Sequence, residues 1–153
     1  DWYGFGRIDV GAAITAALSY TAGSLGTLNI TDYADNASGT LNTSITDNSA
    51  TGITNTIAVS ESEIIEAVQV KINIAHNYIG DVGIELVSPA GTRSVLFTPY
   101  SGFFNADNMI NFILTSNAFY GEETDGNWTL RVIDGDANIT GTLTNWSIRF
   151  YEH

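Results

Sequence analysis

The segment Val68-Gln69-Val70-Lys71-Ile72-Asn73-Ile74 decides the fold, because every second side chain in it is aliphatic. Successive side chains of a strand point to opposite faces of a sheet, so this alternation predicts a strand with one buried face. The same period recurs in four later segments: Val82–Leu86, Ile110–Leu114, Trp128–Val132 and Trp146–Phe150. Turn signals separate the segments, among them Gly80-Asp81 and Ser88-Pro89-Ala90-Gly91. We therefore predict an all-β fold, an antiparallel β-sandwich or jelly roll, over residues 52–153.

Upstream of the predicted sandwich the composition changes twice. Residues 21–51 are rich in Thr, Ser, Asn, Asp and Gly, with scattered apolar positions, which predicts a linker with edge structure. Residues 1–20 contain one predicted helix, Asp9 to Leu18, with Asp9 as its N-cap and an apolar face at helical spacing. An amphipathic helix this short is marginally stable alone, so we expect this segment to be the end of another domain.

Overall composition excludes several classes of function. The 153 residues carry a net charge of −12, with 17 acidic against 5 basic side chains, which disfavours binding to nucleic acid or to an anionic membrane surface. No apolar run is long enough to span a membrane, and the absence of cysteine excludes disulfides and thiolate chemistry. The chain opens without a signal peptide, and its abundant polar uncharged residues suggest the exterior. We expect an internal or C-terminal piece of a secreted, bacterial precursor.

Four ordered sequence blocks carry a resemblance to a known family. They are His76-Asn77-Tyr78-Ile79-Gly80-Asp81, Leu86-Val87-Ser88-Pro89-Ala90-Gly91-Thr92, Gly126-Asn127-Trp128-Thr129-Leu130 and Gly141-Thr142-Leu143-Thr144-Asn145-Trp146. The blocks resemble the P domain (Homo B domain) of subtilisin-like proprotein convertases of the kexin and furin type, and of bacterial serine proteases with the same module. The resemblance covers roughly residues 53–151 and implies a β-sandwich jelly roll, in agreement with the strand periodicity.

The N-terminal segment carries a second resemblance. Tyr3-Gly4-Phe5-Gly6-Arg7-Ile8-Asp9-Val10-Gly11-Ala12-Ala13 resembles the segment that opens the last helix of a subtilase catalytic domain. A subtilase tail followed by a P domain is the order found in these proteases. The sequence has no G-T-S-x-A-x-P nucleophile helix and no H-G-T-type histidine, so we expect no catalytic residue and no activity from this chain by itself. No cofactor-binding motif stands out either.

Acidic residues are the strongest chemical feature. Asp134, Asp136 and Asn138 place oxygen side chains at the spacing that opens an EF-hand loop, but Ile139 and Asn145 stand where such a loop needs glycine and glutamate. A looser all-oxygen calcium site and a solvated turn both remain open. Asp81 and Asp107 are further candidate calcium ligands, although either could instead brace a turn. The high negative charge makes calcium binding more plausible, and the resemblance implies a calcium-dependent protease, many of whose well-defined calcium sites lie in the catalytic domain.

Several other polar and aromatic residues allow more than one interpretation. Solvated charge is the default for the acidic side chains that precede Trp128, which are Glu122, Glu123 and Asp125. His76 follows an apolar strand, which favours a hydrogen-bonded structural role over a ligand role. Five aromatic residues lie in the segment between Pro99 and Gly121: Tyr100, Phe103, Phe104, Phe119 and Tyr120. They could bind sugar, anchor a partner or cap the core. We expect Trp128 and Trp146 in the core.

Three functions fit these patterns. The first is a non-catalytic accessory domain of a secreted subtilisin-like serine endopeptidase, stabilising the catalytic domain of the same precursor and tuning its calcium or pH response or its substrate access. The second is a free-standing jelly-roll module that binds a carbohydrate or a protein. The third is one half of a nicked protease. For the chain by itself we expect a monomer.

Overall fold

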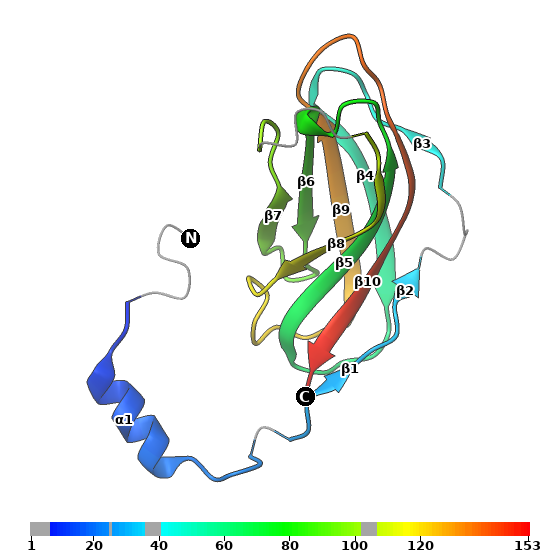
Figure 1. The fold of residues 1–153 in the computed structure, drawn as a ribbon. Coiled ribbons are helices and arrows are strands. Elements are labelled where there is room, and N and C mark those ends of the chain that lie inside the picture. The colour runs from blue at the N-terminus through cyan, green and yellow to red at the C-terminus, as the bar shows by residue number, and fades with distance from the viewer. Residues whose placement is uncertain (1–6, 25, 36–40, 102–106) are drawn as a thin grey trace.

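The computed structural model describes residues 7–24, 26–35, 41–101 and 107–153. Within these ranges, one α-helix and ten strands follow each other (Figure 1). Their bounds are α1 Val10–Ser19, β1 Asn29–Ile30, β2 Ala34–Asp35, β3 Thr43–Ser44, β4 Ser49–Val59, β5 Ile65–Ala75, β6 Val82–Val87, β7 Arg93–Phe97, β8 Met109–Ser116, β9 Gly126–Asp134 and β10 Thr142–Glu152. A short 3₁₀ turn, Ile79–Asp81, leads into β6.

Two antiparallel sheets form the sandwich. One has the strand order β1-β10-β5-β8, with β2 and β3 also paired to β10, and the other has the order β4-β9-β6-β7. The register of β10 on β5 places Trp146 beside Ile72 and Phe150 beside Val68, so the alternating apolar positions share one face. This arrangement confirms the predicted antiparallel β-sandwich.

Both predicted core tryptophans are fully buried between the sheets. Trp128 packs edge-on against Phe119, with ring centroids 5.1 Å apart, and lies 5.3 Å from the ring of Phe150. Its indole N–H donates to the Thr124 carbonyl at 2.8 Å, and that of Trp146 donates to Asn55 Oδ1 at 2.7 Å. Each large ring is therefore held by packing and by a partner for its one polar atom.

The segment before β4 is more structured than its composition suggests. Its short strands β1, β2 and β3 all pair with β10, and together residues 26–35 and 41–45 form what we call the N-terminal strap. Ile45, which counts among the scattered apolar positions in the sequence, is completely buried in the core. The isolated apolar side chains escape a periodicity analysis because each strap strand is only two residues long.

Two strands lack a clear sequence signal, and one has an irregular face. β4 is dominated by Thr, Asn and Gly, and β7 is a five-residue edge strand. In β8 the expectation that Ile110, Phe112 and Leu114 share a half-buried face is wrong for Ile110, which is 75% exposed. A register shift between Ile72 and Ile74 opposes Met109 to Ile74, and Asn111 takes a positive φ of 49°, so the bulge turns Ile110 outward.

Helix α1 begins where the sequence predicts. The Asp9 carboxylate accepts the Ala12 N–H at 2.9 Å, as an N-cap does. No residue of the helix is buried, and Val10, Ile14 and Leu18 are 65%, 57% and 84% exposed. Figure 1 shows the helix lying clear of the sandwich. No helix in the described part of the chain has the length and apolar character needed to cross a membrane.

Candidate functional site

Titratable side chains gather at the end of the sandwich where β5 and β9 end and β6 begins. His76 follows β5, Asp81 closes the 3₁₀ turn, and Asp134 is the last residue of β9. Antiparallel pairing of Val82 with Asp134 brings the start of β6 beside the end of β9. The pairing of the strands therefore brings together, at one end of the sandwich, side chains that lie far apart in the sequence.

His76 and Asp134 form a buried pair. The Nε2 atom of His76 lies 3.3 Å from Asp134 Oδ2, and both side chains are completely buried. The other ring nitrogen, Nδ1, accepts the Tyr78 N–H at 3.0 Å, which leaves Nε2 to donate the proton to the carboxylate. Gly141 passes so close that a Cβ there would overlap the ring. These contacts support the structural interpretation of His76.

Asp81 lies beside this pair in an unfavourable environment. It is only 4% exposed, and its Oδ1 atom has no hydrogen-bond partner. Burial raises the pKa of Asp81, and the neighbouring Asp136 and Asp134 carboxylates raise it further, against a smaller lowering by His76. Three of the predicted acidic residues therefore share one electrostatic environment, which we call the carboxylate cluster: Asp81, Asp134 and Asp136.

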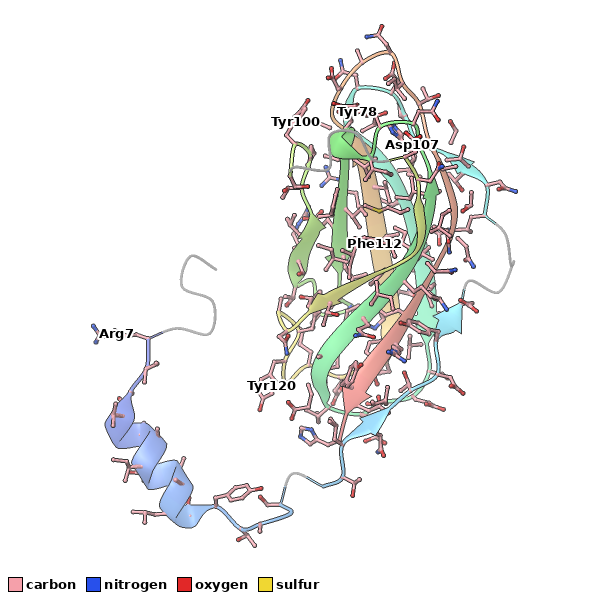
Figure 2. All side chains as sticks on the ribbon, in the orientation of Figure 1. Arg7, Tyr78, Tyr100, Asp107, Phe112 and Tyr120 are labelled. Carbon is pink, nitrogen blue, oxygen red and sulfur yellow. The ribbon has the colours of Figure 1, made fainter. Side chains whose placement is uncertain are left out.

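Tyr100 closes the carboxylate cluster on its outer side. Its hydroxyl donates to the Gly135 carbonyl at 2.9 Å. Desolvation is the largest cause that raises the pKa of Tyr100, and the negative charges of Asp136, Asp81 and Asp134 raise it further. Figure 2 shows Tyr100, Tyr78 and Asp107 at this same end of the molecule.

The cluster is not a ready-made metal site. Both oxygens of Asp134 have partners, since Oδ2 lies beside His76 and Oδ1 accepts the Asp136 N–H at 3.3 Å. Asn138 has a positive φ of 85° and donates its N–H to Asp47 Oδ2 at 3.3 Å. Within the described ranges, no three His, Asp or Glu side chains converge closely enough to hold a metal ion. Calcium binding at Asp81, Asp107, Asp134, Asp136 or Asn138 stays a prediction.

Asp107 lies just before β8, outside the contacts described for the carboxylate cluster. Its neighbour Asn108 makes the link to the strand end, because Asn108 Oδ1 accepts the His76 N–H and Asn108 N–H donates to the His76 carbonyl, each at 2.9 Å. Asp107 itself is exposed. The end of β5 is therefore braced by Asn108, and the role of Asp107 as a calcium ligand stays a prediction.

The aromatic residues do not form a common platform among the described residues. Phe119 is completely buried against Trp128, so it belongs to the core. Tyr100 and Tyr120 are 55% and 51% exposed, but Figure 2 shows them at opposite ends of the sandwich. Phe103 and Phe104 lie outside the described residues. The described side chains thus give no support to a sugar-stacking surface.

At the other end of the sandwich, the sequence analysis overlooks Glu152. This residue continues the inward positions Trp146, Ile148 and Phe150 at a period of two, which places a carboxylate on the core side of β10. It is 6% exposed. The signal was available in the alternation, because an acidic residue at the end of an apolar series must either find a partner or line a cavity. The acidic residues singled out nearby, Glu122, Glu123 and Asp125, lie on the loop before β9.

No serine reaches His76 in the described part of the chain, since its two ring nitrogens are occupied by Asp134 and by the Tyr78 N–H. A Ser-His-Asp triad needs the histidine to contact the nucleophile and the orienting acid at the same time. The geometry of His76 therefore offers a structural brace at the end of β5.

Comparison with known proteins agrees with the sequence blocks. Residues 65–150 match the family described as the proprotein convertase P-domain. The Aeromonas extracellular serine protease of Aeromonas sobria is 33% identical over 144 residues, which is 86% of this chain and 23% of that protein. Furin of Homo sapiens is 28% identical over 153 residues, 97% of this chain and 19% of furin. The chain thus spans about a quarter or less of the length of these relatives.

A solved structure resembles the chain over almost its whole length. The crystal structure of the serine protease of Aeromonas sobria superposes with a TM-score of 0.80 at 28% identity, covering 99% of this chain and 31% of that one. The sandwich, its strand pairing and the four sequence blocks all agree with the family match. The chain belongs to the proprotein convertase P-domain family, whose members are non-catalytic accessory regions of subtilisin-like serine proteases.

Proposed function

We propose that this chain is the accessory P domain of a secreted subtilisin-like serine endopeptidase, which it stabilises by packing against the catalytic domain of the same precursor. The observation that carries the proposal is the extent of the structural match. Nearly the whole chain, including the segment of α1, superposes on a serine protease of which it covers only 31%. The word extracellular in the name of the Aeromonas sobria relative supports secretion.

Two exposed apolar surfaces support a large packing partner. On the edge strand β8, Ile110 and Ile113 are 75% and 50% exposed. On α1, no residue is buried within the described part of the chain, and Val10, Ile14 and Leu18 on its apolar face are exposed. Burying such side chains contributes roughly 1.5–3 kcal/mol each. A catalytic domain that supplies the rest of the precursor would cover them.

Removal of the P domain tests this function. The full-length protease that carries this chain is compared with a form that ends at Tyr20, before the N-terminal strap, and the rates of thermal inactivation and the cleavage specificity of both are measured. We expect faster inactivation of the shortened form, because the catalytic domain loses its packing partner. Equal inactivation rates and equal specificity in the two forms would contradict the proposal.

Tuning of the protease by pH or calcium is a finer part of the same proposal. The carboxylate cluster supports it, because a buried, unpartnered Asp81 next to Asp134 and Asp136 responds both to protons and to cations. Since no three ligands converge in the described ranges, water and backbone carbonyls would have to complete a calcium shell.

A further inference from the structure

A crevice lies at the opposite end of the sandwich from the carboxylate cluster. It encloses about 490 Å³ between the N-terminal strap, the end of β4 and the end of β10. In Figure 1 these segments meet on the β2 side of the lower half of the sandwich. The described residues that matter for its chemistry are Asp32, Ala58, Val59, Glu61, Phe150 and Glu152.

Glu152 lines this crevice with an unsatisfied carboxylate. The residue is 6% exposed, and its Oε2 atom has no hydrogen-bond partner. Burial raises the pKa of Glu152, and the nearby Glu63 and Glu61 raise it further. All three causes disfavour a lone negative charge, so a cation at this position would be stabilised both by attraction and by relief of repulsion.

The nearby basic side chains are engaged with other groups. His153 Nδ1 lies 3.0 Å from Glu66 Oε1. Arg149 donates to Gln69 Oε1 at 2.9 and 2.6 Å, and its guanidinium lies 4.7 Å from the ring centre of Tyr33. Within the described ranges, no ion pair is formed by Glu152. Lys71 Nζ lies 4.1 Å from the ring centre of Tyr33. A cation paired with Glu152 would therefore come from outside these residues.

The walls of the crevice favour an organic cation with an apolar stem. Ala58, Val59 and Phe150 supply apolar wall, while Asp32 and Glu61 add negative charge. Lysine and arginine side chains combine methylene groups with a cationic head, and both pack their stems on apolar surfaces. A divalent metal fits less well, since no three acidic or histidine side chains converge among the described residues.

We propose that this crevice binds a lysine or arginine side chain of another protein segment, with its cationic head at the Glu152 carboxylate and its stem against Val59 and Phe150. Charge complementarity and the unpartnered buried oxygen carry the inference. The site is independent of the proposed accessory function, since it would bind a basic side chain whether or not the P domain stabilises a protease.

Short peptides test the site directly. The ¹⁵N-labelled chain is titrated in the presence of EDTA with acetyl-Gly-Lys-Gly-amide or acetyl-Gly-Arg-Gly-amide, and with acetyl-Gly-Gln-Gly-amide as the neutral match. We expect saturable shifts of the amide signals of Ala58, Val59 and Glu152, with a Kd on the order of 1 mM, for the basic peptides alone. Absence of saturation, or equal shifts with the glutamine peptide, would overturn the proposal.

Glu152→Gln and Asp107→Asn distinguish the site from general charge attraction, because each removes one negative charge. We expect Glu152→Gln to weaken binding at least about tenfold and Asp107→Asn, at the other end of the molecule, to leave it unchanged. Equal weakening by both would show nonspecific attraction and reject the site. A further variant, Ala58→Leu, keeps the charge and places a larger side chain on the exposed wall of the crevice. It should also abolish binding, so it tests the site even if Glu152→Gln perturbs folding.

Discussion

Trp128 shows how one side chain joins several parts of the core. Its ring lies between Phe119 and Phe150, and its N–H satisfies the carbonyl of Thr124, a residue that is 1% exposed. We predict that Trp128→Phe lowers the free energy of unfolding by about 2–3 kcal/mol, because it removes ring volume and leaves a buried carbonyl without its donor. Urea denaturation measures the change.

The matched control for Trp128→Phe is Ile110→Ala, since Ile110 is 75% exposed on β8. That substitution should change the free energy of unfolding by less than about 0.5 kcal/mol. Equal free energies of unfolding for the two variants would contradict a stabilising role for the packing around Trp128.

Asp81 makes the stability depend on pH in a definite direction. Its pKa in the folded protein is raised above the ordinary value of 3.8, so the folded state holds the proton more tightly than the unfolded state does. The folded protein therefore loses stability as the pH rises from 3.8 through the raised pKa, and the loss is complete above it. Below 3.8 the group is protonated in both states and the penalty is absent.

Asp81→Asn should remove this pH dependence. We predict that the variant is more stable than the wild type at neutral pH, and that the difference shrinks as the pH falls below the ordinary carboxyl pKa. Urea unfolding at several pH values, with a chelator present, measures both effects. Exposed Asp107→Asn is the control and should follow the wild-type profile. A lower stability of Asp81→Asn at neutral pH would contradict the unfavourable environment assigned to Asp81.

Individual site residues could be predicted only where the sequence places them next to each other. The acidic loop Asp134–Asn138 is visible as a motif, but its contact with His76 and Asp81 depends on the pairing of β6 with β9. Likewise, the sequence shows Asp107 and Asn108 as neighbours and cannot tell which one will brace His76. Such choices are made by tertiary contacts between residues far apart in the chain.

Glycines at the ends of strands fix how the elements connect. Gly126, which opens β9, has a positive φ of 113°, and a Cβ there would lie 2.7 Å from Pro89 Cβ in the turn after β6. Gly91, in the same turn, also has a positive φ, of 90°, but a Cβ would meet nothing within 4 Å. Both positions have a positive φ, but only at Gly126 would a side chain collide with a neighbouring residue.

We predict that Gly91→Ala costs about 1 kcal/mol through backbone strain alone, and that Gly126→Ala costs about 2 kcal/mol more, because it also overlaps Pro89. Thermal unfolding of both variants measures the difference. Equal costs would show that the contact between the turn and β9 relaxes without penalty.

Strands with an alternating apolar face could be located from the sequence, and strands without one could not. β5, β6, β9 and β10 are found within a few residues of their ends. β4 escapes because Asn55 interrupts the inward series of Ile53, Ile57 and Val59, and the bulge in β8 breaks the period at Ile110. Helix α1 is found because its cap and apolar spacing are local. The division at residues 20 and 51 stays a prediction.

Calcium would act on the molecule as a whole through its charge. The chain has a net charge of −12, and its carboxylate cluster holds an unpartnered oxygen. We predict that millimolar calcium raises the melting temperature over that in EDTA by several degrees, since about 1 kcal/mol moves the midpoint of a domain of this size by roughly 3–6 °C. The rise should disappear in Asp81→Asn. A shift below about 1–2 °C would argue against a calcium site in this chain.

The proposed packing against a catalytic domain requires the exposed apolar surface of β8 to be covered in the whole protease. Ile110 and Ile113 are 75% and 50% exposed in this chain, so replacing both by serine should leave the stability of the chain itself within about 1 kcal/mol of the wild type. In the full-length protease the same two serines would lie at the contact with the catalytic domain. Thr115→Ser, on the same strand, is the matched control.

The decisive measurement is the rate of thermal inactivation of the full-length protease, with and without the double substitution Ile110→Ser and Ile113→Ser. It tests whether the catalytic domain packs on β8. We predict inactivation at least several-fold faster in the double variant and unchanged in Thr115→Ser, because each buried isoleucine at the contact contributes roughly 1.5–3 kcal/mol. Identical inactivation rates in all three proteins would contradict packing of the catalytic domain on this surface.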